Sequence, residues 1–85
     1  MAGGALHEDR TILGSEILDR HRAISPQTEE LEAVDWCDQR IQASENEELR
    51  AALLHNRNDE TEHASILLEW LRRHDTFWFF AVSRG

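Results

Sequence analysis

Two side chains with metal-binding chemistry occupy positions where a helical core would carry Leu or Ile. Glu60 and His63 belong to a run of residues spaced three or four apart, comprising Leu53, Asn56, Glu60, His63, Leu67 and Trp70. This spacing predicts the seam of a packed helix, with Glu60 and His63 on one face about a turn apart. Burying an ionised carboxylate costs several kcal/mol unless a positive group meets it. A Glu-x-x-His pair facing a helical core is half of the ligand motif of di-iron carboxylate bundles.

The preceding helix offers a further carboxylate for this site. Five acids fall within ten residues there, namely Glu29, Glu30, Glu32, Asp35 and Asp38. Such a run is usually a solvated face. Glu30, however, lies beside Leu31 and Val34, on the edge of an apolar stripe. A hairpin of the two helices would bring Glu30 opposite Glu60 and His63.

One chain carries half of a di-iron site, which needs a Glu from each of two helices and a Glu-x-x-His pair from each of two others. Two chains around a two-fold axis would complete a four-helix bundle with four Glu and two His, and four carboxylates balance two ferrous ions. Oxygen and imidazole donors suit iron or manganese. Dimerisation also helps a chain of 85 residues without a disulfide, which has little core of its own.

Other interpretations of the same residues stay open. Glu60 and His63 could form a polar layer that sets the register of a non-catalytic helical oligomerisation module. The site could also be a metal-binding scaffold that holds Zn²⁺ or Ca²⁺ without turnover. A rubrerythrin-like peroxide reductase is disfavoured, because the single Cys37 provides no rubredoxin-type Cys pairs.

A second group of potential ligands lies on the second helix. His55, Asp59 and Glu62 share one helix face at positions i, i+4 and i+7. The pattern permits a secondary, peripheral cation site, for which Ca²⁺ is a candidate. A solvated face is the competing interpretation.

The composition limits the classes of molecule that this chain is expected to bind. The formal net charge is -8, from 17 acidic residues and nine Arg. This balance disfavours nucleic acid and anionic membranes as partners. The lone Cys37 and the lack of a signal-peptide pattern favour a cytoplasmic protein. The longest apolar run, over 77–82, is too short to span a bilayer.

The hydrophobic pattern predicts an all-α chain in three parts: a flexible N-terminus over 1–8, a helical hairpin over 9–74 and an aromatic tail over 75–85. The first helix should start near Asp9, with one stripe made of Leu13, Ile17, Ile24, Leu31, Val34 and Ile41. Pro26 implies either a kinked, nearly continuous helix, which we favour, or a second start capped by Ser25.

The second helix is predicted over 45–73. Ser44 would be its N-cap and Glu47 the capping-box partner. In the tail, Phe77, Trp78, Phe79 and Phe80 are consecutive aromatics, expected to pack back on the hairpin or into a subunit interface.

Several stretches of this chain resemble the encapsulated ferritins, short ferritin-like proteins carried inside encapsulin nanocompartments. The resemblance covers about residues 20 to 74. The stretches that carry it are His21-Arg22-Ala23-Ile24, Glu29-Glu30-Leu31-Glu32-Ala33-Val34-Asp35-Trp36, His55-Asn56-Arg57, Glu60-Thr61-Glu62-His63-Ala64 and Leu68-Glu69-Trp70-Leu71-Arg72-Arg73.

The resemblance implies a ferroxidase that oxidises Fe(II) to Fe(III) at a di-iron centre between two subunits. It implies dimers that form a ring, commonly a decamer, and an encapsulin shell that stores the iron. The implied iron ligands are Glu30, Glu60 and His63. The implied outer, ion-attracting residues are Glu29, Glu32 and Trp36, and the implied secondary metal site is His55, Asp59 and Glu62.

Three departures from the family pattern accompany the resemblance. Cys37 stands where the family often has Tyr, next to the Trp. Pro26 lies four residues before Glu30 and is expected to affect the tilt of that ligand. No C-terminal encapsulin-targeting peptide is visible, so the sequence leaves open how the chain reaches a shell.

Overall fold

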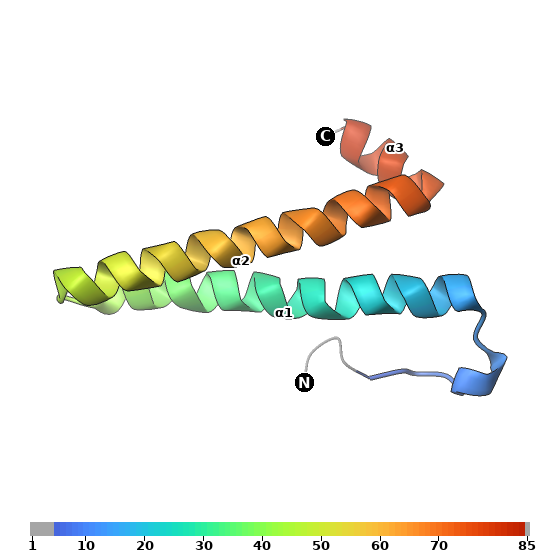
Figure 1. The fold of residues 1–85 in the computed structure, drawn as a ribbon, viewed down its shortest axis with the longest axis horizontal. Helices are drawn as coiled ribbons and strands as arrows, with labels where there is room; N and C mark the ends of the chain where they lie inside the picture. Colours follow the sequence, from blue (N-terminus) through green and yellow to red (C-terminus); the bar gives the residue numbers. More distant parts are fainter. Residues whose placement is uncertain (1–4, 85) are drawn as a thin grey trace.

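Two long antiparallel helices dominate the computed structural model, which describes residues 5–84 (Figure 1). A short 3-10 turn, η1 (Arg10–Ile12), leads into α1 (Ser15–Ala43); α2 (Glu47–His74) returns along it and α3 (Thr76–Arg84) follows. No strand occurs among the described residues. The predicted all-α class and the helical hairpin are confirmed. Not one of the described helices has the length and apolar character needed to cross a membrane.

Helix α1 runs unbroken through Pro26. The prediction of a nearly continuous helix is therefore confirmed, and the alternative of a second helix starting at Ser25 is wrong. A proline costs a helix interior roughly 3 kcal/mol, so the packing of α1 along α2 must outweigh that loss. The predicted start near Asp9 is also wrong. Asp9 instead caps η1 by accepting a hydrogen bond from the Thr11 N–H at 2.9 Å, and α1 begins at Ser15.

The connection between α1 and α2 uses a different cap from the one predicted. The Oδ1 atom of Asn46 accepts a hydrogen bond from the Leu49 N–H at 2.9 Å and so caps α2. Ser44 is the C-cap of α1, and its hydroxyl accepts from the Asn46 N–H at 3.2 Å. The predicted capping box of Ser44 and Glu47 is therefore wrong, because the connection is so short that Ser44 serves the end of α1.

The described part of the aromatic tail is helix α3, which turns away from the end of α2 (Figure 1). Asp75 separates the two helices, and its Oδ1 accepts hydrogen bonds from the N–H groups of Phe77 and Trp78 at 2.9 and 3.3 Å. Phe77 is 76% exposed and does not pack back on the hairpin, so the burial of aromatic side chains in a subunit interface stays a prediction. The side chains of Phe79 and Phe80 lie outside the described part, as do residues 1–4 of the predicted flexible N-terminus.

The interior of the hairpin is thin. Its buried apolar residues are Ala23, Cys37, Ala64 and Leu71, of which only Leu71 is large. Three residues of the predicted stripe on α1 are still exposed, namely Ile17, Ile24 and Leu31. A single hairpin therefore leaves uncovered much of the apolar surface that its sequence pattern was expected to bury.

We predict that Asn46→Ala lowers the free energy of unfolding by about 1 kcal/mol, because the Leu49 N–H loses its capping acceptor. For a domain of this size that corresponds to a drop of about 4–8 °C in Tm, measurable by circular dichroism. Asn56→Ala, at an exposed position inside α2, is the matched control and should cause no loss, since Ala favours a helix interior. Equal losses in both variants would contradict the assignment of the cap.

Candidate metal centre

The hairpin brings together the three ligands predicted from the spacing. Glu30 comes from α1, and Glu60 and His63 from α2. One potential ligand atom from each of these residues lies within 4.8 Å of the other two. We call this group the metal triad. In the part of the chain that the structure describes, no other group of three or more acidic, His or Cys side chains converges in this way.

Glu30 is largely enclosed by the hairpin. Its side chain is 23% exposed, and its Oε2 atom is buried without a hydrogen-bond donor. The nearest triad nitrogen, Nδ1 of His63, lies 3.7 Å from that oxygen, beyond hydrogen-bond range. A buried carboxylate oxygen without a donor is costly, and a bound cation would satisfy it.

The charges of the metal triad also call for a cation. Glu30 and Glu60 place two carboxylates within 4.8 Å of each other. Two like charges at this separation repel each other. Two carboxylates and one imidazole form a donor set that suits iron, manganese or zinc. The donor set therefore fits a divalent transition metal.

The metal triad opens to one side of the hairpin. The side chain of His63 is 56% exposed, while Glu30 and Glu60 are partly buried. A metal bound there would meet three protein donors from this chain and an open side. Further ligands would have to come from solvent or from another protein chain.

The residues implied as ion-attracting lie along α1 outside the metal triad. Glu29 is exposed, Glu32 is partly buried and Trp36 is half exposed. Their spacing of three and four residues places them on the same side of the helix. They do not join the metal triad, and their role stays a prediction.

The implied secondary site is only partly assembled. The Nε2 atom of His55 lies 3.4 Å from Oδ2 of Asp59. Glu62 is exposed, and these three residues do not form a converging group among the described residues. A cation at this position also stays a prediction.

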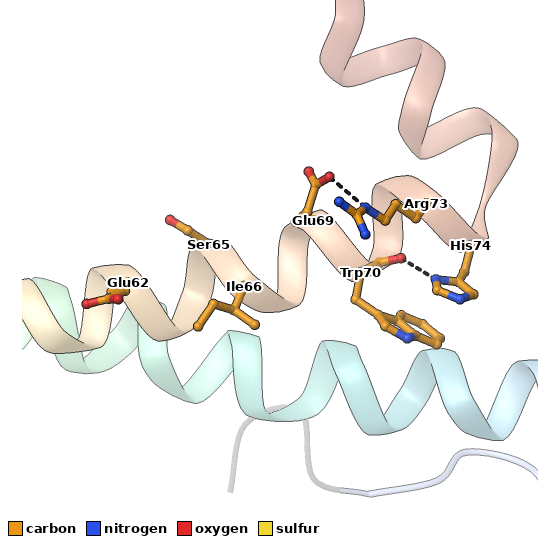
Figure 2. Close-up of a pocket in the computed structure, with 7 residues that line it drawn as sticks. All are labelled: Glu62, Ser65, Ile66, Glu69, Trp70, Arg73 and His74. Atoms are coloured by element: carbon orange, nitrogen blue, oxygen red, sulfur yellow. Dashed lines mark hydrogen bonds and ion pairs between the residues drawn. The ribbon is translucent and has the colours of Figure 1, made fainter.

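A groove of about 480 Å³ on α2 shares no residue with the metal triad (Figure 2). Its lining residues are Glu62, Ser65, Ile66, Glu69, Trp70, Arg73 and His74. The rings of Trp70 and His74 stack with centroids 4.2 Å apart, and His74 Nδ1 lies 2.8 Å from the Trp70 carbonyl oxygen. Hydrogen bonds from Arg72 and Arg73 lower the pKa of Glu69 to about 2, so its carboxylate is already paired. The metal triad is therefore the better candidate for chemistry.

Sequence reasoning missed two contacts that join the helices on either side of the metal triad. The Arg57 Nε–H donates to Asp38 Oδ1 at 2.9 Å, and the Gln27 side-chain amide donates to the Ala64 carbonyl at 3.4 Å. Gln27 and Ala64 lie 17 residues before Ser44 and 18 residues after Asn46, so pairing residues across the predicted hairpin would have found that contact. Asp38 and Arg57 lie 6 residues before Ser44 and 11 residues after Asn46, so the same pairing would not have found theirs.

A sequence model of the EncFtn-like family matches residues 5–82. The chain belongs to the EncFtn-like family. The predicted resemblance to the encapsulated ferritins is thereby confirmed.

Individual relatives agree with this assignment. The chain is 53% identical over 77 residues to the encapsulated ferritin-like protein of Rhodospirillum rubrum, a match that covers 91% of this chain and 55% of that protein. It is 44% identical over 72 residues to a ferritin-like protein of Thermotoga maritima, covering 85% of this chain and 63% of that one. The chain thus spans little more than half of these curated relatives.

The fold has a close structural counterpart. The crystal structure of a protein from Nitrosomonas europaea matches with a TM-score of 0.91 at 44% identity, covering 95% of this chain and 89% of that one. Family and fold therefore agree in assigning this EncFtn-like chain to the ferritin-like proteins.

We predict that Glu30→Gln raises the Tm of the metal-free protein by a few degrees, because it removes the repulsion between Glu30 and Glu60. The same change should abolish the rise in Tm that Co²⁺ produces in the unsubstituted chain, since binding to the folded state stabilises it. Thermal unfolding at pH 8, with and without Co²⁺, measures both effects. A variant that Co²⁺ still stabilises fully would show that Glu30 is not a ligand.

Proposed function

We propose that this protein is a ferroxidase that oxidises Fe²⁺ to Fe³⁺ at a di-iron site formed between two copies of the chain. The observation that carries the proposal is the convergence of Glu30, Glu60 and His63 around a buried carboxylate oxygen without a donor. Membership of the EncFtn-like family supports iron as the substrate.

The need for a second copy of the chain is inferred from the charge of the metal triad and from the exposed apolar surface of α1. Glu30 and Glu60 bring two negative charges per chain, which one Fe²⁺ balances, and a two-fold pair would balance two Fe²⁺ with four carboxylates. The open side at His63 leaves room for donors from another chain. The exposed apolar residues of α1, such as Leu31, would gain burial in a four-helix bundle.

Within this site, each residue has a distinct role. Glu30 would bridge the two iron ions, while Glu60 and His63 would bind one ion from each subunit. Iron supplies the redox chemistry, each Fe²⁺ giving up one electron to dioxygen or another oxidant. Carboxylates favour the harder Fe³⁺ and can change their coordination mode, so they hold charge while the product hydrolyses and leaves.

Residues around the metal triad would bind or attract cations outside the di-iron site. Glu29, Glu32 and Trp36 are proposed to form an ion-attracting surface on α1 that raises the local concentration of Fe²⁺. His55, Asp59 and Glu62 are proposed as a secondary metal site, with Ca²⁺ as a candidate occupant. Neither group is required for the redox step.

The proposal extends to assembly and location. Dimers would associate into a ring, with a decamer as the expected form, inside an encapsulin nanocompartment in the cytoplasm. The name of the Rhodospirillum rubrum relative, encapsulated ferritin-like protein, supports this placement. The shell would store the ferric product for iron storage and detoxification.

We predict that Glu60→Ala reduces fast aerobic Fe²⁺ oxidation to the buffer background while leaving the helical content unchanged. The loss follows from removing one ligand of each iron ion. Oxidation is measured by near-UV absorbance, helical content by circular dichroism and mass by light scattering. Glu48→Gln, an exposed acid in the first turn of α2, is the matched control and should keep full activity.

Three results would contradict this function. Unchanged oxidation by Glu60→Ala would remove the proposed site. No oxidation above background by the unsubstituted chain, together with normal assembly, would favour the oligomerisation module, and bound metal without turnover would favour the scaffold.

A further inference from the structure

We propose that Arg57 and Asp38 form a positioning pair that holds the two helices in the register required by the metal triad. This inference rests on the proposed function, because it assumes that the triad binds metal. Arg57 and Asp38 touch neither the iron nor the oxidant in this account. They act through the alignment of α2 on α1.

The contact joins the two long helices beside the metal triad. The Nε–H of Arg57 on α2 donates to Oδ1 of Asp38 on α1 at 2.9 Å. Arg57 lies one helical turn before Glu60 on α2, and Asp38 lies about two turns after Glu30 on α1. On the other side of the metal triad, Gln27 donates to the Ala64 carbonyl. The triad is therefore flanked by cross-helix contacts on both sides; beyond Gln27, Arg20 Nε on α1 also lies 3.5 Å from Oδ2 of Asp75, the C-cap of α2.

The packing near the metal triad is poorly suited to fixing the register alone. The fully buried residues that flank it are Ala23, Cys37 and Ala64, all small, and the larger Val34, Leu67 and Leu68 are only partly buried. Large side chains interlock between helices and resist sliding, whereas small ones leave shallow ridges and grooves. A slide by one residue moves a ligand by about 1.5 Å along the helix axis. Metal–ligand distances tolerate only about 0.2 Å.

The metal-free triad also needs a restraint against separation. Glu30 and Glu60 repel each other across the interface between α1 and α2. The bridge between Arg57 and Asp38 joins the same two helices, so it opposes that separation. A second contact orients the guanidinium, because Arg57 also donates from a terminal nitrogen to Asn58 Oδ1 at 3.3 Å. The planar guanidinium gives the bridge a direction that a Lys ammonium would lack.

The bridge differs from an ordinary surface ion pair in what it joins. Arg50 and Glu47 make an ion pair at 3.1 Å, but both lie on α2, three residues apart. Their pair restrains only the local helix surface. Arg57 and Asp38 have side chains 35% and 53% exposed, which makes their direct contribution to stability small. Their proposed effect is on ligand geometry rather than on overall stability.

The test is the affinity of the full chain for Co²⁺, measured from the visible absorption of the bound ion well below Tm. We expect Arg57→Met and Asp38→Asn each to weaken binding about tenfold, the lower limit usual for supporting residues around a metal site. The double variant should bind no more weakly than the single variants, because both remove the same bridge. Arg57→Lys should recover only part of the affinity, and the matched control Arg50→Met should bind like the unsubstituted chain.

The outcomes separate this inference from the proposed function. If the unsubstituted chain does not bind Co²⁺, both are overturned. If it binds and Arg57→Met binds equally well, with or without a lower Tm, the positioning role alone is overturned. Additive losses in the double variant would likewise overturn it. If Arg57→Met does not fold, Asp38→Asn decides the matter by the same criterion.

Discussion

The close approach of Glu30, Glu60 and His63 across the hairpin is the constraint on which the rest of the site depends. The hairpin holds both carboxylates within 4.8 Å of each other and of His63, and leaves one Glu30 oxygen buried without a donor. Such an arrangement destabilises the empty fold and favours any cation that fits. The packing of α1 along α2, the connection at 44–46 and the contacts on either side of the metal triad keep the carboxylates together. In the proposed ferroxidase, binding of Fe²⁺ neutralises the two carboxylates, and the relief of their repulsion contributes to the affinity for Fe²⁺.

The thin interior of the hairpin also indicates that two copies of the chain associate. Leu71 is the only large side chain among the buried apolar residues described, and Ile24 and Leu31 stay exposed on α1. The hairpin is a single layer of two helices, with α3 turned away from it (Figure 1). A second copy would cover apolar surface and close the open side of the metal triad at once. One interface would then serve both stability and chemistry, which suits a chain of 85 residues.

Much of this site could be predicted from the sequence, because helical spacing alone places Glu60 and His63 on one face and a hairpin then selects Glu30. The nearly continuous first helix was also predictable, despite Pro26. The N-cap of α2 could not be predicted, because Ser44 and Asn46 are both suitable N-cap residues. Only the geometry of the connection shows which of the two caps the helix. The helical state of the tail was hidden by its aromatic composition. The exposure of Leu31 was missed because a hydrophobic stripe indicates burial without saying whether its partner is the same chain or another.

The most direct test of the central claim is anomalous X-ray diffraction from crystals of the iron-loaded protein. We predict two iron positions per pair of chains, close to a two-fold axis, with Glu30 bridging them and Glu60 and His63 bound from each subunit. A single iron held by the metal triad of one chain, with no donor from a second copy, would contradict the shared centre. Iron bound elsewhere, with the metal triad empty, would contradict the site itself.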